Sequence, residues 1–373
     1  MGKPKNIRSI FVFIAKTLNI CFGICLLVSL ATPYINPIHI PILPFFGLGF
    51  PILFVLNILF MLLWLFQKSR WFWGSLIILI VSIPFQMKIF SLNLISIDKA
   101  IGAKSDFKIM SYNVRLFDLY NPSFKEALAS RNSIFQFLRN EDPDILCLQE
   151  YYEQKEPSTF HTKDSIQAIL NSTHFFKKGF YIPHGKQTFG LACFSKFPIL
   201  NQGCVTHQGS QGNNKNFCIY IDIVKNKDTV RVYNVHLQSI KLETKFYVKN
   251  ISEGNKDETT KGIKRGFSKL KKAFAIRAKQ SAAVNEHILT SPFPTIVCGD
   301  FNDTPISYTY HKFEDNLIDA FRNTSTGFGS TYIGFLPAGR IDYIFHSETL
   351  NSSGFKIQTQ ELSDHRAISC TIY

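Results

Sequence analysis

The chain has 373 residues, a formal net charge of +14, and only 18% charged residues against 14% aromatic ones. Disorder is excluded, because a disordered chain needs high charge and few aromatic residues. The 21 glycines and 16 prolines are near ordinary usage, which excludes a collagen-like or low-complexity chain. Eight cysteines in a chain of this length exclude a small disulfide-stapled fold. The length predicts about two domains.

Residues 1–88 have the composition of a membrane segment. They contain seven basic residues and no acidic one, since the first acidic residue is Asp98. Apolar runs at about 10–31, 43–66 and 71–87 each approach the ~20 residues that a helix needs to cross a bilayer. We therefore expect three transmembrane helices, with the lipid bilayer as a partner. The alternative, a buried helical hairpin of a soluble protein, fits three acid-free runs poorly.

The basic residues around these runs predict an orientation. They precede the first run or lie between the second and the third, and they are Lys3, Lys5, Arg8, Lys68 and Arg70. Positive residues favour the cytoplasmic side, so the N-terminus is expected in the cytoplasm. Three spans then place the remainder, a linker at 89–105 and a soluble domain at 106–373, on the extracytoplasmic side of the cytoplasmic membrane. Lys88, at the outer end, is one charge against this orientation.

Two cysteines are candidates for a disulfide. Cys204 and Cys218 flank a stretch rich in glycine and asparagine, and an oxidising compartment would allow them to pair. Connectivity does not follow from sequence, so this pairing stays open.

Residues 106–373 alternate between short strand-like and helix-like stretches. Strands are expected at about 107–114, 145–148, 190–195, 217–224, 229–236, 294–299, 340–345 and 365–372. Helices are expected at about 125–140, 163–170 and 261–289. Many short strands with few helices predict α/β or α+β layers around two packed sheets.

Polar side chains recur where these strands stop, at positions that packing does not explain. They are Asn113, Glu150, His236, Asp300, Asn302, Asp342, Asp364 and His365. Strand ends present catalytic groups rigidly. Carboxylate and amide oxygens are the ligands that a hard cation such as Mg²⁺ or Mn²⁺ prefers. No zinc-type Cys/His spacing and no glycine-rich phosphate loop is present in the sequence.

At these positions the sequence resembles the endonuclease/exonuclease/phosphatase superfamily. The matching motifs, in family order, are Ser111-Tyr-Asn113, Leu148-Gln-Glu150, Asn234-Val-His-Leu237, Gly299-Asp-Phe-Asn302, Arg340-Ile-Asp-Tyr-Ile-Phe345 and Ser363-Asp-His365. One departure is Arg366-Ala367, where the family often has an aromatic residue and proline. The resemblance covers roughly 106–373 and implies a four-layer α/β sandwich of two mixed sheets flanked by helices, with the site at one mouth of the sheets.

The resemblance also implies roles for the strand-end residues. Glu150 is the main carboxylate ligand of Mg²⁺ or Mn²⁺, helped by Asn113 and Asp364. Asp300 and Asn302 position and activate the attacking water. His365, oriented by Asp342, contacts the scissile phosphate and assists proton transfer. His236 lies on the other side of the phosphate. For Asp342 the alternative is an ion pair that only stabilises the fold.

A basic stretch follows the His236 strand. Residues 241–279 contain twelve basic and four acidic residues. Five of the basic residues are the predicted substrate-binding set: Lys264, Arg265, Lys269, Lys271 and Lys272. They would hold a nucleic acid backbone or rest on anionic lipid headgroups. The alternative is a solvated helix face without a ligand.

Together these features predict a membrane-anchored, divalent-metal-dependent phosphoesterase acting on a phosphodiester or phosphomonoester. The first hypothesis is a nuclease-like phosphodiesterase with nucleic acid as substrate. The second is a lipid or inositol phosphoesterase working at the membrane surface. The third is an inactive membrane-bound binding module, which the complete set of catalytic residue types argues against.

Overall fold

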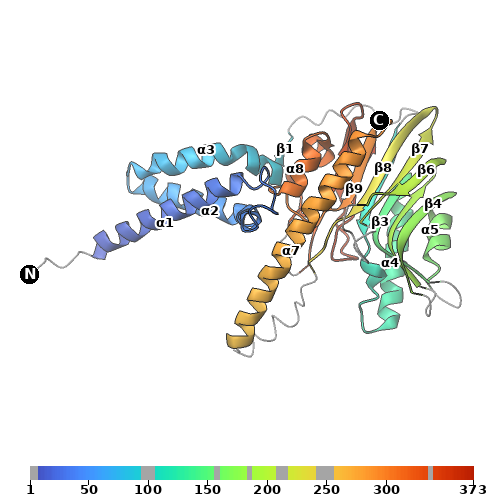
Figure 1. Cartoon of the computed structure of the whole chain (residues 1–373), viewed down its shortest axis with the longest axis horizontal. Coiled ribbons are helices and arrows are strands. Elements are labelled where there is room, and N and C mark those ends of the chain that lie inside the picture. Colours follow the sequence, from blue (N-terminus) through green and yellow to red (C-terminus); the bar gives the residue numbers. More distant parts are fainter. Residues whose placement is uncertain are drawn as a thin grey trace, which may run out of the picture.

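The computed structural model describes residues 7–93, 106–154, 160–182, 187–206, 217–240, 256–334 and 339–373. Figure 1 shows an N-terminal helical bundle joined end-on to a larger layered domain. The bundle consists of α1 (Ile7–Leu30), α2 (Leu43–Phe66) and α3 (Trp71–Ile89). Each of these helices is long and apolar enough to cross a membrane. The three apolar N-terminal helices expected from the sequence are therefore present.

A buried polar cluster ties the three bundle helices together. The indole N–H of Trp64 in α2 donates to the side-chain oxygen of Asn19 in α1, at 2.8 Å. The amide nitrogen of Asn19 donates to the hydroxyl of Ser75 in α3, at 3.1 Å. All three side chains are buried. Hydrogen bonds of this kind hold apolar helices together where hydrophobic burial alone does not select partners.

Two six-stranded mixed sheets form the larger domain. The first has the order β10-β12-β9-β8-β7-β6 and the second β13-β14-β2-β3-β5-β4. Their strands are β2 (Phe107–Asn113), β3 (Ile145–Gln154), β4 (His174–Ile182), β5 (Gln187–Ser195), β6 (Ile199–Cys204), β7 (Cys218–Lys225), β8 (Asp228–His236), β9 (Thr295–Asp300), β10 (Ile318–Asp319), β12 (Asp342–His346), β13 (Ser352–Ile357) and β14 (Ile368–Ile372).

The sheets pack face to face, with helices on both outer faces. Strand alternation decides which side chains go where: along β3, Ile145 and Cys147 enter the core between the sheets, whereas Leu146 and Leu148 enter an outer core. The helices are η1 (Arg115–Asp118), α4 (Phe124–Glu141), α5 (Thr162–Leu170), α7 (Lys256–Leu289), α8 (Tyr308–Glu314) and α9 (Ala320–Thr324). The predicted sandwich of two mixed sheets flanked by helices is confirmed.

The parallel strand pairs bring the polar strand ends together. β2 runs parallel to β3, and β8 runs parallel to β9. In the second pair His236 lies directly opposite Asp300. Because the carboxyl ends of parallel strands share an edge, both pairs present their terminal side chains at the same mouth of the sandwich.

The N-terminal helical bundle is packed against the layered domain. Ile306 joins Leu26, Phe50 and Leu79 in one apolar cluster. The stretch expected to be a linker, 89–105, begins with the last residue of α3 and continues into a strand, β1 (Phe90–Leu92), which pairs with β11 (Thr326–Phe328). The rest of that linker, 94–105, lies outside the described residues. All three helices of the bundle thus share an apolar core with the layered domain.

Cys204 and Cys218 are both free thiols, Cys218 being buried at the start of β7. The disulfide that the sequence left open is therefore not formed. Burial raises the pKa of the Cys218 thiol well above its ordinary value, so this cysteine is a small apolar core residue.

Candidate active site

Asp300 occupies the centre of the strand-end cluster. It ends β9 directly after Gly299, whose φ of 143° suits only glycine. A Cβ on Gly299 would lie 2.0 Å from the carbonyl oxygen of Val235, so the glycine is what lets β9 approach β8 this closely. The backbone here places the Asp300 carboxylate, which is 1% exposed, between the two sheets' ends.

Two asparagines hold this carboxylate by hydrogen bonds. The side-chain amide of Asn113 donates to Oδ2 of Asp300 at 3.0 Å. Asn302 donates twice, from its backbone N–H to Oδ1 at 2.8 Å and from its side-chain amide to Oδ2 at 3.1 Å. Asn302 has a φ of 54°, a left-handed conformation that costs energy outside glycine and is typical of functional sites. The sequence predicted Asn113 as a metal ligand. In the structure its side-chain amide donates a hydrogen bond to Asp300.

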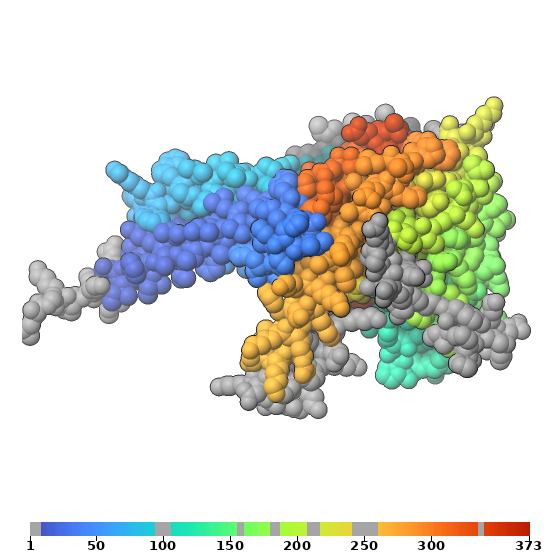
Figure 2. All heavy atoms as spheres, in the orientation of Figure 1, coloured from blue at the N-terminus to red at the C-terminus, as the bar shows by residue number. Residues whose placement is uncertain are grey.

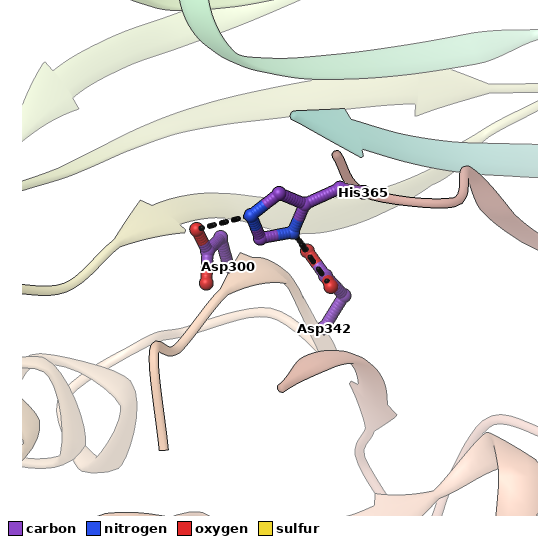
Figure 3. Close-up of side chains that lie close together, drawn as sticks. All are labelled: Asp300, Asp342 and His365. Atoms are coloured by element: carbon purple, nitrogen blue, oxygen red, sulfur yellow. Dashed lines mark hydrogen bonds and ion pairs between the residues drawn. The ribbon is translucent and has the colours of Figure 1, made fainter. Parts of the chain in front are cut away.

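His365 links Asp300 to Asp342, as Figure 3 shows. Its Nδ1 lies 3.0 and 3.1 Å from the two carboxylate oxygens of Asp342, and its Nε2 lies 3.6 Å from Oδ2 of Asp300. Burial opposes a charged imidazole, but the carboxylates of Asp342 and Asp300 outweigh it and raise the pKa of His365 to about 10. The geometry makes Asp342 a partner of His365; the arginine of its motif, Arg340, pairs instead with Asp319.

The pKa of Asp300 is also raised, by burial first and by the charge of Asp342, with His365 acting in the opposite direction. A carboxylate whose pKa rises becomes a stronger base. Its bonded asparagines fix its orientation at the same time, so Asp300 is arranged to accept a proton from a group held at the mouth of the site.

His236 approaches Asp300 from the other side. Its Nε2 lies 3.5 Å from Oδ2 of Asp300. This nitrogen is buried and makes no hydrogen bond within the described residues. A buried polar atom without a partner is rare in a folded protein and calls for an explanation. An oxygen of a bound substrate would satisfy it.

Glu150 is aimed into the site by a break in the β3 ladder. The pairing of β3 with β5 shifts register between Leu148 and Tyr151, and Glu150 in this bulge has a φ of 48°. Bulges re-aim single side chains and occur beside active sites. Asp364 lies near the same place, since burial first and then the charges of Glu150 and Asp364, partly offset by Arg115, raise the pKa of Tyr120 to about 12.

Two sets of residues have the chemistry to hold a divalent cation. Ligand atoms of Asp300, Asp342 and His365 all lie within 4.8 Å of one another. In that set, however, both oxygens of Asp342 already face Nδ1 of His365. Glu150 and Asp364 are only partly buried and offer carboxylate oxygens, the ligand type that Mg²⁺ prefers. The residues therefore fit a metal at Glu150 better than at the His365 pair.

Several site residues escaped the sequence analysis. Tyr332 pairs with His365 in an isolated bridge, with ring centroids 5.1 Å apart. Arg115, in η1, places its Nε 3.6 Å from Asp364. Both come from irregular segments, where no periodicity marks them. Gln149 and Asn234 did stand in the quoted motifs, and their side chains bond each other across the two sheets at 2.7 Å.

The five predicted basic residues do not act as one group. Lys269 and Lys272 line a cavity of about 330 Å³ together with Gln238, Ser239 and Ile240, which directly follow the His236 strand. Lys264, Arg265 and Lys271 do not line that cavity and are exposed along the N-terminal half of α7. The structure therefore brings only part of this set near the site.

The sequence pattern of the Endonuclease/Exonuclease/phosphatase family matches residues 110–365. The chain belongs to this family. Its members are phosphoester hydrolases that generally use a divalent metal, and the chain has their fold. Residues 8–89 match a domain of unknown function (DUF8431). No curated protein sequence matches the chain.

Solved structures agree with this family. One is an endonuclease/exonuclease/phosphatase family protein from Leptotrichia buccalis C-1013-b, 15% identical over 72% of this chain and 99% of that one, with a TM-score of 0.51. Another, from Bacteroides thetaiotaomicron, is 16% identical over 72% and 97%, with a TM-score of 0.50. A functionally unknown conserved protein from Enterococcus faecalis V583 is 16% identical over 71% and 99%, with a TM-score of 0.51. At these identities the likeness concerns the fold alone.

Proposed function

We propose that the protein is a membrane-anchored, divalent-metal-dependent phosphodiesterase of nuclease type, which hydrolyses phosphodiester bonds by water attack. The observation that carries this proposal is the convergence on Asp300. A buried carboxylate with a raised pKa is held by two amides and flanked by two histidines, one of them bonded to Asp342. The Asp300 carboxylate can therefore act as a base, while the histidines and the two side-chain amides around it can donate hydrogen bonds.

The residues divide the reaction between them. Glu150, with Asn113 and Asp364, would hold Mg²⁺ or Mn²⁺, which when bound neutralises phosphate charge and polarises the phosphorus. Asp300, positioned by Asn302, takes a proton from the attacking water as its oxygen bonds to phosphorus. His365, charged at neutral pH because of Asp342, binds the phosphate oxygens and stabilises the charge that builds on them. The ester P–O bond breaks, and the leaving oxygen keeps the bonding electron pair and takes a proton from solvent. His236, beside Asp300, donates a hydrogen bond on that leaving-group side.

A second candidate, a lipid or inositol phosphoesterase, is favoured by a different observation. The mouth-side helix α7 touches the membrane bundle, since the ring of Phe267 stacks on Phe45 of α2 at 4.0 Å. A catalytic domain held this close to a bilayer can reach the phosphates of lipids that remain in the bilayer. The third hypothesis, an inactive binding module, predicts no turnover of any phosphoester.

The test is a substrate panel for the full-length protein in nanodiscs: duplex DNA, single-stranded nucleic acid, sphingomyelin and inositol phosphates, with and without Mg²⁺. We expect Mg²⁺-dependent cleavage of nucleic acid that is lost in Glu150→Gln. Turnover of the lipid or inositol substrates alone would overturn the nuclease assignment in favour of the second candidate. Absence of turnover on every substrate would overturn both.

We also propose that the catalytic domain lies on the extracytoplasmic side, which the distribution of basic residues supports. A reporter that is active only outside the cytoplasmic membrane, fused after Tyr373, should be active. A reporter that works only in the cytoplasm should be silent at the same position. The opposite pattern would reverse the orientation.

A further inference from the structure

Helix α7 carries its charges on two different faces. Lys269 and Lys272 face the cavity beside Gln238, together with Ile276 of the same helix. At 100° per residue, the strip formed by residues 263, 267, 270 and 274 lies on the side of the helix opposite Lys272, and Lys264 and Lys271 flank that strip, about 90° and about 70° from its middle. The face with Lys269 and Lys272 thus lies beside the candidate active site. The face with the apolar strip, Lys264 and Lys271 needs a separate explanation.

That strip is apolar and points toward the membrane bundle. It consists of Ile263, Phe267, Leu270 and Phe274. Phe45, in the first turn of α2, stacks on Phe267 at 4.0 Å and meets Phe274 edge-on at 5.4 Å. Since α2 is a candidate membrane span beginning at Leu43, this contact holds the middle of α7 at the level where that span enters the bilayer.

Other exposed apolar groups lie at the same level. The turn between α1 and α2 exposes Tyr34, Ile38, Ile40 and Ile42, each more than two-fifths accessible. On α7, Ile263 is 62% exposed and Phe267 is 42% exposed. Figure 2 shows the N-terminal half of α7 projecting from the catalytic layers below the start of α2. Apolar side chains gathered at the end of a transmembrane bundle fit the interfacial region of the bilayer.

The lysines beside the apolar strip complete an interfacial pattern. Lys264 and Lys271 are exposed, and in the described part of the chain neither forms an ion pair. Lysines next to an apolar strip reach headgroups while their stems cover the acyl boundary. Two uncompensated positive charges held at this level complement an anionic lipid surface.

We propose that the N-terminal half of α7 is an interfacial helix, in which Ile263 and Phe267 enter the bilayer surface and Lys264 and Lys271 bind anionic phospholipid headgroups. This surface is distinct from the Lys269 and Lys272 face. It holds the catalytic domain at a fixed tilt on the bilayer that α1 to α3 span. This proposal goes beyond the proposed phosphodiesterase activity, because lipid binding by α7 does not depend on catalysis.

The experiment is backbone hydrogen exchange on the full-length protein in nanodiscs of phosphatidylcholine, with or without a minor share of phosphatidylglycerol. Amides of residues 261–272 should exchange more slowly on the anionic bilayer, by roughly fivefold for each lysine that contacts it. About 1 M salt should remove the difference, since the contact is electrostatic. The Lys264→Gln/Lys271→Gln variant should lose it at low salt.

The matched control is Arg265→Gln/Lys279→Gln, which removes two exposed charges from other sides of the same helix. It should keep the lipid-dependent protection. Equal exchange rates on both bilayers would overturn the proposal. So would an equal loss of protection in the control variant, because the protection would then depend on the total charge of the helix and not on Lys264 and Lys271. Stronger protection by added duplex DNA than by anionic lipid would reassign the face to nucleic acid. Because exchange needs no catalysis, these outcomes are separate from failure of the proposed function.

Discussion

The pairing of Asp342 with His365 gives a quantitative prediction. The rise in the pKa of His365 from the ordinary 6.5 to about 10 corresponds to about 5 kcal/mol of preference for the protonated form. Asp342 contributes more to this rise than Asp300 and is the nearer carboxylate, at 3.0 Å against 3.6 Å. Asp342→Asn removes the larger of the two contributions that raise the pKa. Burial, which lowers the pKa of His365, is then opposed by Asp300 alone.

The expected result is a change in the pH dependence of hydrolysis. In the wild type His365 stays charged through neutral pH, so kcat should hold up to roughly pH 9. In Asp342→Asn we expect the alkaline limb to move down by at least ~2 pH units, so that kcat at about pH 9 falls by ~10-fold or more. A pH–rate profile gives both quantities, and an NMR titration of His365 reports its pKa without turnover.

The control is Asp315→Asn, which removes an exposed carboxylate 3.2 Å from His311, a histidine of α8. Its pH–rate profile should match that of the wild type. An unchanged alkaline limb in Asp342→Asn, with the protein still folded, would refute the reasoning. So would additive losses in a cycle of Asp342→Asn with His365→Ala, because two residues that act as a unit lose activity non-additively.

Three further variants, together with the pH dependence of stability, test other parts of the structure. Glu150→Gln keeps size and removes a charge, so activity should fall by at least ~10²-fold with an unchanged melting curve; full activity at limiting Mg²⁺ would contradict the ligand assignment. Gly299→Ala should destabilise far more than Gly354→Ala in denaturant unfolding, since both have positive φ but only Gly299 faces a backbone oxygen. Arg340→Met should cost about 3–5 kcal/mol by leaving the buried Asp319 unpaired, and adding Asp319→Asn should recover part of it. Because the folded-state pKa of His365 is raised, its stabilising contribution is complete below pH 6.5 and is lost as pH rises to about 10; the wild-type Tm should fall across that range, and a flat Tm would contradict the shift.

Arg340 links the N-terminal bundle to the strand that carries Asp342. Its guanidinium donates to the carbonyl oxygen of Lys88, in the last turn of α3, at 2.9 Å. Tyr343, which follows Asp342, donates to the carbonyl oxygens of Arg340 and Asp303, both at 2.8 Å. Two hydrogen bonds thus link the last turn of α3 to the strand that holds Asp342.

Local patterns in the sequence determined the elements. Runs of about twenty apolar residues without an acid predicted the three N-terminal helices, because a bilayer demands length and apolarity and little else. Short strand-like runs predicted the central strands, such as 229–236, which the structure places at Asp228–His236. Edge strands such as β4 (His174–Ile182) were missed, because Lys177, Lys178 and Gly179 interrupt any apolar pattern on a strand with one free side.

Tertiary structure alone decided how the polar residues meet. Asn113 and Asp300 are far apart in the chain, and only the packing of the two sheets makes one amide donate to the other's carboxylate. Helical periodicity in the sequence assigns Phe267 and Lys272 to different faces of α7, but it does not say what each face meets. The contact of Phe45 with Phe267 decided that, by placing the apolar face against the first turn of α2 and leaving the other face for the cavity beside the site. Local periodicity shows which side chains share a face of a helix. The segment that packs against that face is distant in sequence, so only the tertiary structure reveals it.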